Sequence, residues 1–159
     1  MGNSIIFQYS YHNMNTQKIG KVIAEIINAK IIDLKDNTEP VELDKYDLIG
    51  FGSGIASGRH YIQLLKYVEE LKSFQGKKVF IFSTCGTYNK RRMTNNHRAL
   101  RNLLQSKKLE IIGEFSCKGF SYYHFKLLKT KKRFEMNKGR PNEDDIKNAE
   151  AFAEKLLIR

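Results

Sequence analysis

The segment KKVFIFSTCGTY, residues 77–88, contains the clearest strand of the sequence together with the loop that follows it. Its first half is an apolar run rich in β-branched and aromatic residues that comes directly after Gly76, as is typical of a buried strand. Its second half changes to small and polar residues and includes Gly86. In sheets of parallel strands, ligands bind beyond the carboxyl ends of the strands. The residues that follow each strand are therefore the main evidence for function.

Further strands and helices alternate on both sides of this segment. Apolar runs predict strands at residues 4–9, 30–34 and 47–51, and a more alternating pattern predicts an edge strand at residues 109–115. Apolar residues at helical spacing predict helices near residues 19–27, 61–71, 100–104 and 146–157. Pro141 and Asn142, followed by three acidic residues, mark the start of the last helix.

This alternation predicts an α/β fold, a three-layer sandwich with a five-stranded parallel sheet in the order 2-1-3-4-5 and helices on both faces. The link at residues 35–46 contains Pro40 and lacks helical periodicity. We expect it to be an irregular crossover with a short turn of helix near Leu43. The length of 159 residues suits a single domain, residues 1–159.

The sequence lacks the features of membrane and secreted proteins. No stretch is long and apolar enough to span a bilayer, and the N-terminus carries no secretory signal. The cysteines, Cys85 and Cys117, do not form a CxxC motif. They follow neighbouring predicted strands, so a redox pair is possible, but buried reduced thiols fit a cytosolic chain better. We therefore expect a cytoplasmic protein without membrane partners.

The charge is strongly positive. The chain has 28 lysines and arginines against 17 acidic residues, a formal net charge of +11. Such an excess favours an anionic partner, which can be a nucleotide cofactor, an acidic protein or a nucleic acid. The total alone does not choose among them.

The loop after the first strand, residues 10–16, is rich in hydroxyl and amide side chains, has no acidic residue and opens a helix. Unpaired backbone N–H groups and the helix dipole favour an anion at such a position. A phosphate there could bind backbone N–H groups and the side chains of Ser10, Asn15 and Thr16. A simple helix cap formed by Asn15 or Thr16 is the alternative.

Two more loops follow the third and fourth strands. One contains Ser53, Gly54, Ile55 and Ala56, and glycines there allow close approach of the backbone to a flat ligand. The other contains Ser83, Thr84, Cys85 and Gly86, with Tyr88 able to stack on a planar ring. The predicted strand order brings all three loops together. Because their glycines match neither GxGxxG nor GxxxxGK[ST], NAD and ATP sites are disfavoured.

These loops resemble the flavodoxin family. Asn15-Thr16 is similar to the end of that family's phosphate loop, although Asn13 and Tyr11 stand where the family usually has serine or threonine. The loops at residues 53–57 and 83–88 resemble its two flavin-flanking loops, and residues 113–120 and 137–141 resemble a subgroup of short microbial members. The resemblance implies bound FMN and a cofactor site formed by Ser10, His12, Asn13, Asn15, Thr16, Ser53, Gly54, Ile55, Ala56, Ser83, Thr84, Cys85, Gly86 and Tyr88.

The function implied is non-covalent FMN binding with electron transfer to and from a redox partner protein. Basic flanks suggest an acidic partner whose association weakens as salt rises. They also suggest a less negative potential for the last reduction step than an acidic flavodoxin would have. An FMN-dependent NAD(P)H:quinone-type oxidoreductase and a non-enzymatic nucleic-acid or protein binding module remain as alternatives, because fold alone does not fix function.

The remaining candidates are histidines and basic runs. No histidine spacing matches a metal site. We expect His12 near the phosphate, His60 near the flavin ring, and His97 and His124 on the surface. Residues 91–101 and 126–133 are basic runs, which we interpret as solvated faces in preference to a nucleic-acid site. Aromatic residues at 122–125 are candidates for a docking surface or a lid.

Overall fold

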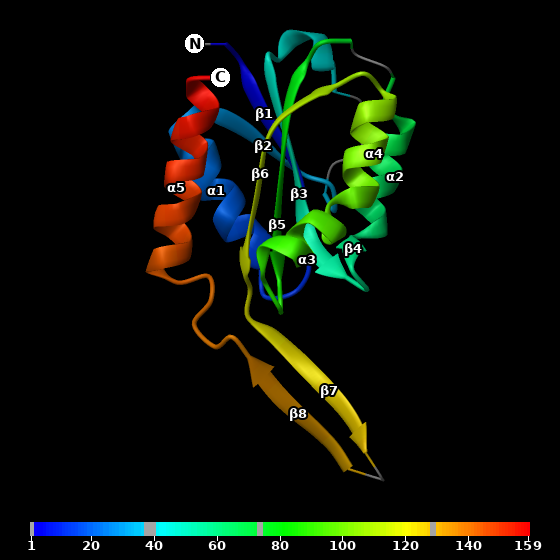
Figure 1. Ribbon diagram of the computed structural model, residues 1–159, viewed down its shortest axis with the longest axis vertical. Helices are drawn as coiled ribbons and strands as arrows, with labels where there is room; N and C mark the ends of the chain where they lie inside the picture. Colours follow the sequence, from blue (N-terminus) through cyan, green and yellow to red (C-terminus); the bar gives the residue numbers. More distant parts are fainter. Residues whose placement is uncertain (1, 37–40, 73–74, 128–129) are drawn as a thin grey trace.

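A parallel sheet forms the centre of the fold (Figure 1). The computed structural model describes residues 2–36, 41–72, 75–127 and 130–159. In this part of the chain the parallel strands are β1 (Ser4–Tyr9), β2 (Ala29–Asp33), β3 (Leu48–Ala56), β5 (Lys78–Cys85) and β6 (Glu110–Lys118). Their order is β2-β1-β3-β5-β6, which confirms the predicted order of the five strands.

Helices cover both faces of the sheet (Figure 1). Helices α1 (Asn15–Ile27) and α5 (Glu143–Leu157) pack on one face, and α2 (Ile62–Glu70) and α4 (Arg98–Ser106) pack on the other. Consecutive residues along a strand point to opposite faces of the sheet. Ile6 accordingly joins the buried cluster under α1 and α5, whereas Phe7 joins the cluster under α2 and α4. Burial on both sides explains the continuous apolar runs of the central strands.

Glycines in β3 leave room for the aromatic residues of β5. A Cβ atom on Gly50 would lie 2.3 Å from the ring of Phe80, and one on Gly52 would lie 2.2 Å from the ring of Phe82. Both rings are fully buried. The phenylalanines of the clearest predicted strand therefore depend on glycines in the neighbouring strand for their space.

The structure adds elements that the sequence did not predict. Strand β4 (Arg59–His60) pairs antiparallel with the end of β3 through a tight turn at Ser57 and Gly58, which have φ of 51° and 75°. The short helix α3 (Lys90–Asn96) precedes α4. A separate hairpin of β7 (Ser121–Leu127) and β8 (Thr130–Met136) projects from the end of β6 (Figure 1).

Other local predictions are confirmed. A short 3₁₀ turn, η1 (Leu43–Lys45), lies in the crossover between β2 and β3, while Pro40 falls outside the described residues. Helix α5 begins after Asn142, which forms a capping box with Asp145. Among the residues described, no helix combines the length and the apolar character needed to cross a membrane.

Candidate functional site

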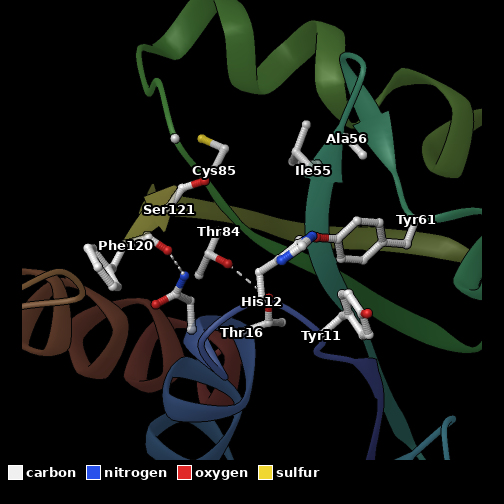
Figure 2. A pocket seen from close by; sticks show the side chains of 14 residues that line it. Tyr11, His12, Thr16, Ile55, Ala56, Tyr61, Thr84, Cys85, Phe120 and Ser121 are labelled. Atoms are coloured by element: carbon white, nitrogen blue, oxygen red, sulfur yellow. Dashed lines mark hydrogen bonds between the residues drawn. The ribbon is translucent and has the colours of Figure 1, made fainter. Parts of the chain in front are cut away.

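A pocket lies where the carboxyl ends of β1, β3 and β5 meet the start of the hairpin (Figure 2). It is lined by residues of all three predicted loops and by the segment after β6, namely Tyr11, His12, Asn15, Thr16, Gly54, Ile55, Ala56, Tyr61, Thr84, Cys85, Gly86, Gly119, Phe120 and Ser121. The structure thus brings together nine of the residues predicted for the site. The predicted residues Ser10, Asn13, Ser53, Ser83 and Tyr88 do not line it.

The first loop leaves the start of α1 open to an anion. Met14 occupies the N-cap position in a left-handed conformation, and its side chain makes no capping hydrogen bond. Ser10 is buried, and its Oγ accepts a hydrogen bond of 3.1 Å from the backbone N–H of Gln17. The first-turn N–H groups of a helix have no partners within the helix. The N–H of Asn15 donates to the carbonyl oxygen of His12, at 3.4 Å. This leaves the N–H of Thr16 and the positive end of the helix dipole for a negatively charged group at this end of the pocket.

Thr16 joins the first loop to the third. Its Oγ1 lies 2.9 Å from Oγ1 of Thr84, and both side chains are buried (Figure 2). This bond spans the carboxyl ends of β1 and β5, which flank β3 in the sheet. It holds the two sides of the pocket at a fixed separation.

Asn13 and Asn15 hold the start of the hairpin. Their side-chain amides donate hydrogen bonds of 3.0 and 2.7 Å to the carbonyl oxygen of Phe120. Oδ1 of Asn15 is buried and has no protein partner among the described residues. A Cβ atom on Gly119 would lie 2.7 Å from the Asn15 side chain, so this contact requires glycine. Asn15 therefore presents an unsatisfied acceptor next to the pocket.

Aromatic side chains form the opposite side of the pocket. Figure 2 shows Tyr11 and Tyr61 on the side of β3, across from Phe120. The ring of Tyr61 lies 5.8 Å from that of Tyr9 and 6.3 Å from that of His12. Burial, and then the neighbouring tyrosines, raise the pKa of Tyr61, so its hydroxyl stays protonated at neutral pH. Tyr88 instead lines a separate hollow with Met93 and Lys118.

A buried polar network lies behind the pocket loops. Ser53, in β3, is 2.8 Å from Nδ1 of His60, whose ring centre is 5.0 Å from that of His97. Nε2 of His97 lies 2.8 Å from Oγ of Ser83, in β5. The surface position predicted for His97 is wrong, because its ring is fully buried. His60 is buried as well and does not line the pocket.

The carboxylate of Glu114 completes this network. It lies 2.9 Å from Nδ1 of His97 and accepts two hydrogen bonds of 2.7 Å from Arg101. Burial tends to raise the pKa of Glu114, but the hydrogen bonds and charges of His97 and Arg101 outweigh it and lower the pKa to about 2. Burial, together with His97, holds the pKa of His60 well below its usual value, so His60 is neutral. The network fixes the strand ends from which two pocket loops begin.

The cysteines face opposite sides of the sheet. Sγ of Cys85 lies near Oγ of Ser116, whereas Cys117, the next residue along β6, belongs to the cluster under α1 and α5. Both thiols are unpaired and buried, and burial raises the pKa of each. The prediction of buried thiols is confirmed, and their opposite orientation excludes an intramolecular disulfide without a backbone rearrangement.

Comparisons with known proteins agree with this fold. Residues 6–154 match the family described as a flavodoxin domain. An uncharacterized protein of Methanocaldococcus jannaschii is 44% identical over 155 residues, which cover 97% of each chain. Oxidised Flavodoxin 1 from Bacillus cereus is 15% identical, with a TM-score of 0.68 over 99% of both chains. A flavoprotein from Lactobacillus acidophilus NCFM in complex with FMN is 16% identical, with a TM-score of 0.57 over 73% of this chain and 93% of that one. The two structural likenesses concern the fold.

Proposed function

This chain belongs to the flavodoxin family, and from that membership we propose that it binds FMN non-covalently in the pocket and carries electrons to and from a protein partner. One observation supports the proposal above all. A helix start open to an anion and a set of aromatic side chains face the same pocket at the carboxyl ends of the parallel strands. FMN combines a phosphate with a flat ring, and it would supply the redox chemistry when bound.

The phosphate end of FMN fits the start of α1. The N-cap residue Met14 offers no side-chain cap. Because the N–H groups of Asn15 and Gln17 already bond to His12 and Ser10, the N–H of Thr16 and the helix dipole are what would bind a phosphate oxygen. Buried acceptors without a donor are costly in a folded protein. Oδ1 of Asn15 is such an acceptor, and a hydroxyl of the ribityl chain would supply its donor.

The ring of FMN fits the space between the second and third loops. Around Gly86, the nearest side-chain atom to an added Cβ would be Cε of Met136 at 3.5 Å, so the backbone there is open to close approach by a ligand. Gly54 has the opposite environment, because a Cβ atom would lie 2.7 Å from the ring of Tyr61. Gly54 thus lets Tyr61 pack against β3 and form the aromatic wall.

A pair of substitutions at His12 tests the orientation of FMN. His12 is exposed at the mouth of the pocket, beside the start of α1. His12→Asp and His12→Asn differ little in shape but differ by one negative charge. Repulsion of a nearby phosphate should weaken FMN binding in the aspartate variant roughly tenfold relative to the asparagine variant. Riboflavin, which lacks the phosphate, should bind both variants equally.

Titrations that follow quenching of flavin fluorescence would measure these affinities. Equal FMN affinities in the two variants would contradict the placement of the phosphate near His12. Failure of the unsubstituted protein to bind FMN would contradict the proposed function itself.

A further inference from the structure

The excess positive charge is confined to one segment of the chain. Residues 86–134 contain 13 of the 28 lysines and arginines but only 2 of the 17 acidic residues. The rest of the chain is therefore electrically balanced. The segment forms α3, α4, β6 and the hairpin of β7 and β8. Two of these elements, α3 and the hairpin, adjoin the pocket.

Helix α3 presents exposed cations close to the pocket. It begins four residues after the pocket residue Gly86, and Lys90, Arg91 and Arg92 are all exposed. Neither α3 nor α4 contains an acidic residue. Among the ion pairs of the described residues, none involves these three cations. Their charge is thus available to a partner.

The hairpin places basic residues opposite one another. The register of β7 and β8 puts Lys126 opposite Lys131. An isolated two-stranded hairpin is only marginally stable in water. In the described part of the chain, β7 and β8 pair with each other and with no further strand. The run of cations in these strands would attract an acidic partner.

The base of the hairpin is bonded to two pocket loops. Asn13 and Asn15 bind the carbonyl oxygen of Phe120, as described above. On the other strand, the side chain of Asn137 donates hydrogen bonds to the carbonyl oxygens of Gly86, at 2.6 Å, and Gly119, at 3.2 Å. The orientation of the hairpin therefore depends on the same residues that shape the pocket.

We propose that α3 and the hairpin together form the docking surface for an acidic partner protein, which they hold over the mouth of the pocket. This inference rests on the proposed function, because an electron carrier must bring its pocket close to a partner. The cations lie on two separate elements, α3 and the hairpin, an arrangement that fits a broad protein surface better than the continuous groove used by single-stranded nucleic acids.

Matched charge variants test the docking surface. One variant carries glutamine at Lys126, Lys131, Lys132 and Arg133, and a second carries Arg91→Gln and Arg92→Gln. A control carries glutamine at four exposed lysines elsewhere, Lys21, Lys30, Lys66 and Lys72. Fluorescence anisotropy of labelled poly-L-glutamate measures binding of an acidic chain at physiological salt. A labelled oligothymidylate of matched length is the probe for a nucleic-acid site. Flavin absorbance of the same samples reports FMN uptake separately.

We expect the hairpin variant to lose affinity for poly-L-glutamate roughly tenfold, the α3 variant to lose several-fold, and the control to change less than about twofold. Equal losses in the hairpin variant and the control would overturn the proposal. Tighter binding of oligothymidylate, lost in the hairpin variant, would overturn it in favour of a nucleic-acid site. Absent FMN uptake would instead overturn the proposed function.

Discussion

Replacing Glu114 by glutamine tests whether the buried network behind the pocket is held by charge. The carboxylate is bound by His97 and Arg101, and its pKa falls from the ordinary 4.5 to about 2. Because the folded-state pKa lies below the unfolded value, the stabilisation is complete above about pH 4.5 and is lost as the pH falls toward 2. The difference in pKa corresponds to about 3 kcal/mol of stability at neutral pH.

Glu114→Gln should therefore lower the free energy of unfolding by about 3 kcal/mol at pH 7. At pH 3 the unsubstituted protein has already lost about 2 kcal/mol of this contribution. The difference in free energy of unfolding between the two proteins should therefore shrink by that amount. Urea unfolding followed by circular dichroism at several pH values measures this difference. Glu110→Gln, at an exposed position on the same strand, is the control and should change stability by less than about 0.5 kcal/mol. If the difference in free energy of unfolding between the unsubstituted protein and Glu114→Gln stays constant from pH 7 to pH 3, the reasoning is refuted.

Three further predictions concern the pocket. Gly54→Ala forces the ring of Tyr61 away from β3 and should weaken FMN binding roughly tenfold, as measured by flavin fluorescence. An unchanged affinity would show that Tyr61 does not contact the flavin ring. Thr16→Val removes the bond to Thr84 and should lower the free energy of unfolding by about 1 kcal/mol in urea; no loss would mean that this bond contributes nothing to stability. With a net charge of +11, the last reduction step of the FMN-loaded protein should have a less negative potential than in an acidic flavodoxin, and a strongly negative value in a redox titration would rule this out.

The sheet and the loops of the site could be predicted because they depend on local patterns. Apolar runs identified the strands, and the change to small polar residues after Phe82 identified one side of the pocket. The start of α5 could be predicted for the same reason, since Asn142 and the acidic residues after it form a local cap. Strand order then followed from the alternation of strands and helices.

The residues that were misplaced depend on contacts between distant parts of the chain. His97 stands in a polar stretch, and only its pairing with Glu114, 17 residues later, explains its burial. Tyr61 fitted a helical stripe, but it is the N-cap residue of α2, and its ring turns toward the pocket. Tyr88 comes at the end of the expected loop, just before α3 begins. It lines the hollow beside Met93 of α3 in place of the pocket.

The hairpin escaped prediction for a different reason. Its strands mix lysines with aromatic residues, and the sequence where one strand gives way to the other, Leu-Leu-Lys-Thr at residues 127–130, has none of the glycine or asparagine signals of tight turns. The turn at Ser57-Gly58 did carry such a signal, a serine–glycine pair, which could have revealed β4 and the burial of His60.

The central claim is that the pocket holds FMN. The most direct test is the visible absorbance spectrum of the purified protein, recorded as isolated and again after incubation with excess FMN and desalting. We expect the desalted protein to keep the absorption bands of flavin, at about one flavin per chain. A colourless protein after desalting would contradict it.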